Sequence, residues 1–330
     1  IDSVPGWAGD TWAAVIRSAG PPTLERLRMP GPLERDTARG GSSILKHQAL
    51  CPFRAFASNR LGAEALETPV DGISAMLHGS LFHRVLEKFW KETRTQDALI
   101  QLDDARLEQR IQDIVGQVVA EERSLQDRGQ FRDVESRRLA RLAMNHLELE
   151  KTRGPFEVAE YEKELREEIE GQVVRLVIDR IDRLPSGEQV IIDYKTGRVD
   201  PKMWFGNRPE DPQLPLYAIS ADFTPAAVVF AVVRDDECHY RGVTAREDIF
   251  PDLPPQRGAQ SEDIRKAGEA MPETIADWRR TLHRLMADFL TGKAAVDPRD
   301  GRETCKNSYC TLQSLCRLEE LEHIRGEAPA

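Results

Sequence analysis

The sequence predicts an α/β fold in which a helical N-terminal half is followed by a β-sheet. Apolar residues recur at helical spacing in three segments: 75–92, 102–125 and 139–149. Beyond residue 155 the pattern changes to β-rich segments: 156–170, 172–184, 189–195 and 226–233. A long amphipathic helix is then predicted over 275–290. With 330 residues, the chain can bury a sizeable core without the help of disulfides.

The first 40 residues are set apart from the rest by their prolines and glycines. Residues 1–40 predict little regular structure beyond a short helix between Thr11 and Ser18, and we interpret them as a linker or wrapping arm. Residues 41–330 are then expected to form one domain. Because the sequence starts with Ile1, we expect it to be a fragment of a longer protein.

A short helical hairpin is expected at the start of this domain. Ser42 and Ser43 can cap a helix that runs toward Cys51. Pro52 should interrupt this helix, because proline cannot donate the backbone hydrogen bond that a helix interior needs.

The amino-acid composition indicates in which compartment the protein works and which kinds of partner it binds. Five cysteines, an odd and small number, argue against a secreted disulfide framework and favour a reducing cytoplasm. No apolar run approaches the roughly 20 residues of a membrane helix, so no membrane partner is expected. The net charge of -10 counts against a nucleic-acid partner, although a local basic groove can coexist with an acidic average.

Two of the predicted strands form a β-hairpin whose register can be counted. If the three residues after Leu184 form the loop, with Gly187 at positive φ, then Leu184 pairs with Glu188. Counting back along both strands places Asp179 opposite Asp193. Two acidic side chains therefore converge on one face of the predicted sheet.

A lysine joins them, since Lys195 lies two residues beyond Asp193 on the same face. An isolated Asp-x-Lys pattern is more often a solvated strand edge, but the apolar run 190–192 indicates a buried strand. Opposed carboxylates repel unless a cation lies between them, and Mg²⁺ prefers such oxygen ligands. Asp182 should face the other side, as a salt-bridge partner of an arginine.

Further motifs surround this hairpin in a specific order. They are Ser43-x-Leu45, Cys51-Pro52-x-x-x-Phe56, Gly79-x-x-x-His83-x-x-x-Glu87, Ile178-Asp179-Arg180-Ile181-Asp182, Ile192-Asp193-Tyr194-Lys195 and Gln213-x-x-x-Tyr217. Over residues 42–317 the chain resembles the RecB-type branch of the PD-(D/E)XK nuclease superfamily, and more closely the C-terminal nuclease domain of AddB-like DNA repair proteins. The resemblance implies a mixed central sheet flanked by helices, as in restriction endonucleases.

The resemblance also implies roles for individual residues. These are metal ligands His83, Asp179 and Asp193, the catalytic lysine Lys195, and DNA-binding residues Gln213 and Tyr217. Taken alone, His83 would more often be a core histidine, and Gln213 and Tyr217 are as compatible with helix packing. A further acid is expected on the preceding strand, where Glu160, Glu162 and Glu164 remain open alternatives.

Four cysteines come from the two ends of the predicted domain, residues 41–60 and 297–320. Cys51, Cys305, Cys310 and Cys316 can hold either Zn²⁺ or an iron-sulfur cluster, and spacing alone favours zinc. The resemblance implies a [4Fe-4S] cluster that staples both ends together. Cys238 is interpreted as a packed strand residue.

The function expected is that of a Mg²⁺- or Mn²⁺-dependent deoxyribonuclease, exonuclease-type, in cytoplasmic DNA repair or recombination. Its substrate would be single-stranded DNA or DNA ends, supplied by a helicase partner. Aromatic residues near the site could stack on bases, although core packing is the more common role: Tyr194, Trp204, Phe205 and Tyr217. The alternatives are a non-catalytic DNA-binding module of the same fold and a CRISPR-associated nuclease.

Overall fold

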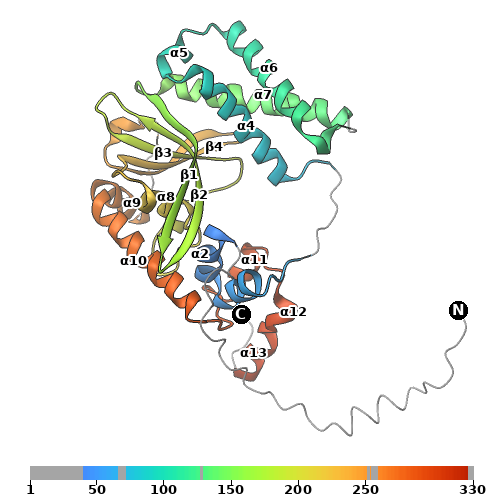
Figure 1. Ribbon diagram of the computed structural model, residues 1–330, viewed down its shortest axis with the longest axis vertical. Coiled ribbons are helices and arrows are strands. Elements are labelled where there is room, and N and C mark those ends of the chain that lie inside the picture. The colour runs from blue at the N-terminus through green and yellow to red at the C-terminus, as the bar shows by residue number, and fades with distance from the viewer. Residues whose placement is uncertain (1–39, 66–71, 127–128, 251–252, 254–258, 326–330) are drawn as a thin grey trace, which may run out of the picture.

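The computed structural model describes residues 40–65, 72–126, 129–250, 253 and 259–325. It has an α/β fold in which a mixed five-stranded sheet lies between two helical layers (Figure 1). The proposed helix between Thr11 and Ser18, and nearly all of the proposed arm, lie outside the described residues.

The strands follow one another across the sheet in chain order. They are β1 (Glu157–Ile169), β2 (Gln172–Arg183), β3 (Gln189–Lys195), β4 (Ala227–Val233) and β5 (Cys238–Thr244). Neighbours are antiparallel except β3 and β4, which are parallel, so the sheet is mixed as expected. The four predicted strands are confirmed. β5 was not among them, but it confirms that Cys238 is a strand residue.

One helical layer covers the upper face of the sheet in Figure 1. It consists of α4 (Ala75–Thr93), α5 (Gln96–Ile100), α6 (Asp104–Glu121) and α7 (Gly129–Thr152), with a 3₁₀ turn η2 (Arg123–Leu125). The hydroxyl of Ser74 accepts a hydrogen bond from the backbone N–H of Leu77 and fixes the start of α4. Apolar residues of α4 at helical spacing are fully buried against the sheet, as the sequence predicted: Leu81, Phe82, Val85, Leu86 and Phe89.

The second layer covers the opposite face. It contains α2 (Gly41–Leu50), α8 (Gln213–Ser220), α9 (Ala259–Glu269) and α10 (Met271–Leu290), together with the 3₁₀ turn η3 (Pro201–Trp204). The 3₁₀ turn η4 (Glu247–Ile249) instead packs through Ile249 into the core of the first layer. Trp278 and Phe289 of α10 pack in one core with Ile191 of β3 and Phe230 of β4. The predicted helix over 275–290 is confirmed and begins four residues earlier, whereas α9 was not predicted.

The two ends of the described domain lie side by side (Figure 1). α3 (Pro52–Ala55) and a π-helical turn η1 (Phe56–Arg60) follow α2, and the C-terminal helices are α11 (Arg302–Asn307), α12 (Gln313–Cys316) and α13 (Leu318–Arg325). The expected serine cap of α2 is wrong. Gly40 precedes the helix at φ 109°, a conformation that glycine adopts freely, and Ser43 instead donates to the Gly40 carbonyl.

Among the helices that the structure describes, none combines the length and the apolar character of a membrane-spanning segment.

Candidate active site

The site lies at the C-terminal end of β3, and the β2–β3 hairpin builds it. Gly187 has φ 88°, and the N–H of Leu184 donates to the carbonyl of Glu188 over 2.8 Å, as predicted. The strand register then pairs Arg180 with Ile192. Continuing this register by one residue places Asp179 opposite Asp193.

A third carboxylate extends this row onto β1. The pairs Tyr161 with Arg180 and Lys163 with Ile178 flank Glu162, which therefore lies opposite Asp179. Glu160, Glu162 and Glu164 were left as alternatives, and the structure brings Glu162 to the site. The sequence could have selected Glu162. A two-residue turn at Glu170 and Gly171, both of which have positive φ, pairs Ile169 with Gln172, and counting back from this pair places Glu162 opposite Asp179.

His83 reaches the same point from α4. Its Nδ1 lies 3.3 Å from Oδ2 of Asp179, and its Nε2 lies 2.9 Å from the carbonyl oxygen of Tyr194. Since a carbonyl only accepts, Nε2 must carry the hydrogen, which leaves Nδ1 free to bind a cation when the ring is neutral. Ligand atoms of His83, Glu162 and Asp179 all lie within 4.8 Å of one another.

Asp193 is fully buried, and its partners are Lys195 and Gln213. The Nε2 of Gln213 donates to Oδ1 of Asp193 over 2.9 Å, and the Nζ of Lys195 donates to Oε1 of Gln213 over 3.0 Å. The Nζ of Lys195 also lies 2.5 Å from Oδ2 of Asp193, an oxygen that accepts no hydrogen bond of normal geometry. Gln213 in turn donates to the hydroxyl of Tyr217 over 2.7 Å. The amide of Gln213 thus orients both the acid and the lysine.

The predicted ligand set was His83, Asp179 and Asp193, and the structure divides it differently. His83 and Asp179 group with Glu162, while Asp193 is held by Lys195 and Gln213. All of these groups belong to one site, because Asp179 and Asp193 are neighbours across β2 and β3.

The acids disfavour one another in this site. Burial, followed by the charge of Asp179, raises the pKa of Asp193. The pKa of Glu162 is raised for the same two reasons. Burial alone would lower the pKa of His83, but the neighbouring Asp179 and then Asp193 outweigh it and raise that pKa to about 9. A cation would relieve this repulsion.

The residues present fit a hard divalent cation. The carboxylates of Glu162 and Asp179 and the imidazole of His83 lie close enough together to hold one ion, and the carboxylate of Asp193 lies beside Asp179. Mg²⁺ and Mn²⁺ accept such oxygen-rich donor sets and keep positions for water and phosphate.

Asp182 faces away from this site, as predicted. Arg180 donates to both of its carboxylate oxygens over 2.5 and 2.8 Å, and Arg153 lies 2.9 Å from it. Glu150 of α7 completes a buried network by accepting from Arg180 over 2.8 Å. The hydroxyl of Tyr194 also accepts from Arg180 over 3.1 Å, so this network supports the strand that carries the site.

The open cleft beside the site lies between the start of α4 and the end of β3. Its lining includes Ser80, His83, Glu87, Glu162 and Lys195. Two basic side chains, Arg84 and Lys195, line this cleft, and each is paired with acidic groups: Arg84 with Glu121 and Glu122, and Lys195 with Asp193. Three of the aromatic residues considered for base stacking, Tyr194, Trp204 and Tyr217, are buried and pack in the two hydrophobic cores.

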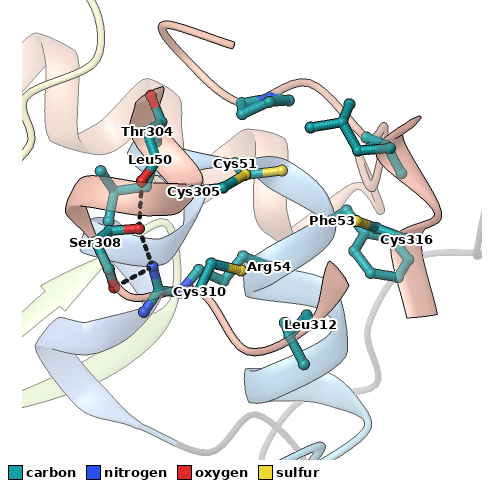
Figure 2. Close-up of a pocket in the computed structure, with 13 residues that line it drawn as sticks. Leu50, Cys51, Phe53, Arg54, Thr304, Cys305, Ser308, Cys310, Leu312 and Cys316 are labelled. Carbon is teal, nitrogen blue, oxygen red and sulfur yellow. Dashed lines mark hydrogen bonds between the residues drawn. The ribbon is translucent and has the colours of Figure 1, made fainter. Parts of the chain in front are cut away.

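The four cysteines of the two domain ends line a second pocket (Figure 2). Cys51 lies at the junction of α2 and α3, Cys305 in α11, Cys316 at the end of α12, and Cys310 in the segment between these two helices. Burial, and then the neighbouring cysteines, raise the pKa of Cys305 to about 11. Among the described residues, no three cysteine sulfurs lie within 4.8 Å of one another. The structure therefore gathers the cysteines without assembling a metal site by itself.

The fold and site define an α/β protein with a carboxylate-rich site at the end of its central strands. A sequence model of the PD-(D/E)XK nuclease superfamily matches residues 42–317. The chain belongs to this superfamily, whose members are generally nucleases that depend on divalent metals such as Mg²⁺ or Mn²⁺. Among solved structures, the crystal structure of SSO0001 is similar, with 17% identity, a TM-score of 0.29 and coverage of 83% of this chain and 94% of that chain. No functionally curated protein matches the chain significantly.

Proposed function

We propose that the chain is an exonuclease-type, Mg²⁺- or Mn²⁺-dependent deoxyribonuclease domain of the AddB-like kind, acting in cytoplasmic DNA repair or recombination beside a helicase. The observation that carries the nuclease proposal is the row of Glu162, Asp179 and Asp193 across three strands, with Lys195 at its end. Opposed carboxylates are costly in an apo protein, so their alignment needs a functional reason.

The residues divide the work of phosphodiester hydrolysis. A bound divalent ion supplies Lewis-acid chemistry, acidifying water and neutralising phosphate charge. Glu162, Asp179 and Asp193 hold the charge that such an ion requires, and His83 adds a nitrogen ligand. The ammonium of Lys195, oriented by the amide oxygen of Gln213, can donate to the phosphate oxygens as negative charge develops.

The deciding experiment incubates labelled single- and double-stranded DNA with the protein, with and without Mn²⁺. We expect metal-dependent cleavage that Asp193→Ala abolishes and Lys195→Ala slows by about two to three orders of magnitude. Asp248→Ala is the control, because this exposed carboxylate pairs with Arg246 away from the site. Cleavage at the wild-type rate by Asp193→Ala would rule out this active site, and binding without cleavage by the wild type would favour a non-catalytic DNA-binding module.

We also propose that the cysteine pocket holds a [4Fe-4S] cluster. What supports this proposal is that Cys51, Cys305, Cys310 and Cys316, which come from the two ends of the domain, line one pocket. Four thiolates are the ligand set of a [4Fe-4S] cluster, and Zn²⁺ is the alternative that the same set can hold. Protein prepared without oxygen should be brown and carry about four irons per chain. Stoichiometric zinc without iron or sulfide would contradict the proposal.

A further inference from the structure

Two arginines connect the cysteine pocket to the loop that enters α8. Arg208 donates through Nε to the carbonyl of Ala49 over 2.8 Å and through Nη2 to the carbonyls of Leu50 and Asp297, over 3.2 and 2.7 Å. Its Nη1 also donates to Oδ2 of Asp297 over 3.0 Å. Arg299 donates its backbone N–H to the same Leu50 carbonyl over 2.9 Å. We call these two residues and their acceptors the arginine clasp.

Arg299 also binds the loop that enters α8. The Nη1 of Arg299 donates to the backbone carbonyl of Arg208 over 3.1 Å, and its Nη2 donates to the carboxylate of Glu210. Three segments far apart in the sequence are thereby joined: the end of α2, residues 297–299 and residues 208–210. Because Leu50 directly precedes Cys51, one wall of the cysteine pocket is part of this junction.

Only a short and stiff stretch separates the clasp from the active site. Pro209 and Pro212 fix two φ angles within it, and both residues are buried. Asp211 accepts the N–H of Gln213 over 3.3 Å, at the first residue of α8. Gln213 is the residue whose amide contacts both Asp193 and Lys195. Because this stretch has little freedom to absorb a movement, a shift of the backbone at Arg208 is expected to move the side-chain amide of Gln213 as well.

We propose that Arg208 is a positioning residue for the nuclease reaction: it anchors the Pro209–Pro212 stretch so that Gln213 holds Asp193 and Lys195 in their reactive arrangement. This inference rests on the proposed function. The guanidinium of Arg208 holds the end of α2, and the four residues 209–212 join Arg208 to Gln213, so the cysteine pocket and the active site are mechanically connected. A side chain that served stability alone would have no dependence on Gln213.

The test is a double-mutant cycle of Arg208→Gln with Gln213→Ala, assayed at saturating DNA and Mn²⁺. Since misplacing a catalytic group by about 1 Å costs up to roughly a hundredfold in rate, we expect Arg208→Gln to lower kcat by about tenfold or more. The change in KM should be smaller. In the Gln213→Ala background the same substitution should have no further effect on kcat. Arg208→Lys, which keeps the charge but loses the fork, should restore part of the rate.

Arg246→Gln is the matched control. Arg246 is also an ion-paired arginine, bound to Glu188 and Asp248, but it lies on a loop that does not lead to α8. It should leave kcat unchanged in both backgrounds. Multiplicative effects of Arg208→Gln and Gln213→Ala on kcat would show that Arg208 does not act through Gln213 and would overturn the proposal.

A second readout does not require cleavage, so it separates this proposal from the proposed function. In hydrogen exchange without DNA, Arg208→Gln should accelerate exchange of the backbone amides within residues 213–217, of which Pro215 has none, and leave β5 unchanged. If the wild type cleaves no DNA but this acceleration is found, the proposed function fails and the mechanical connection stands. Unchanged exchange in 213–217 would overturn the connection itself.

Discussion

Asp193 lowers the stability of the folded protein at neutral pH, although its carboxylate is a proposed part of the active site. Its carboxylate is fully buried beside Asp179, and its pKa is raised above the ordinary 3.8 of an aspartate. The unfolded chain releases this proton at lower pH than the folded protein does. The stability that Asp193 contributes is therefore fully present below about pH 3.8 and is lost as pH rises through the folded pKa.

The first prediction follows from this sign. Without metal, Asp193→Asn should become more stable relative to the wild type as pH rises above 4, by about 1.4 kcal/mol per pH unit up to the folded pKa. Urea unfolding in EDTA across this range measures the difference. Asp248→Asn, an exposed control, should show no such trend. A difference between Asp193→Asn and the wild type that does not change with pH would contradict the raised pKa.

The second prediction concerns Glu162, which the structure selects from three candidate acids. Glu162→Gln should weaken Mn²⁺ binding at least about tenfold, since a charged ligand is replaced by a neutral one. Glu164→Gln changes an exposed residue of the same strand and should leave the affinity unchanged. Isothermal titration with Mn²⁺ measures both variants, and equal affinities would remove Glu162 from the site.

The third prediction at this scale concerns the pH dependence of metal binding. His83, with a pKa of about 9, and Asp193 hold protons that a metal must displace. The increase in Tm that saturating Mn²⁺ produces should therefore grow between pH 6 and pH 9. The same measurement on His83→Gln should show a weaker dependence. A Tm increase independent of pH would mean that neither group is a ligand.

At the scale of elements, the buried ion network fixes β2 and β3 to the helical layer. Burial opposes the charge of Glu150, but Arg180 and Arg153 outweigh it and hold its pKa well below the ordinary range. The guanidinium of Arg180 also lies 4.3 Å from the ring centre of Trp90 on α4. Paired charges inside a core are costly to separate, because the remaining partner stays buried.

Asp182→Ala should consequently lower the free energy of unfolding by about 3 to 5 kcal/mol, since it leaves Arg180 and Arg153 without one of their two carboxylates. Mn²⁺ affinity at the active site should change little, because Asp182 faces the other side of the sheet. Urea unfolding and Mn²⁺ titration of the same protein test this fourth prediction. A loss of affinity without a loss of stability would place Asp182 in the site instead.

The sequence allowed the elements to be predicted wherever their apolar pattern is regular. β1 to β4 and α4 show such patterns, whereas β5 includes polar His239, Arg241 and Gly242, and α9 is largely charged. Counting from the Gly187 turn gave the register that opposes Asp179 and Asp193. The contact of Gln213 with Lys195 could not be counted, because it depends on how α8 packs across the sheet.

At the scale of the whole molecule, the cysteine pocket joins segments from both ends of the described domain. The fifth prediction is that Cys316→Ala lowers metal content and the free energy of unfolding together, since the binding energy of a structural metal group is part of the folding energy. Closing a chain loop of this length is worth on the order of 5 kcal/mol. Cys238→Ala is the control, because this cysteine lies in β5. Normal stability in metal-depleted Cys316→Ala would contradict the prediction.

The same joining of distant segments sets the order of events during synthesis. The guanidinium of Arg54 donates to the hydroxyl of Ser308, 254 residues later, and the N–H of Phe53 donates to the carbonyl of Ala295. At about 5 to 20 residues per second, a ribosome needs roughly 13 to 50 s to supply these partners. The α2–α3 segment must wait that long with its polar groups in water. The nascent chain therefore completes its cysteine pocket late, and Cys51 stays accessible to oxidants and thiol reagents until then.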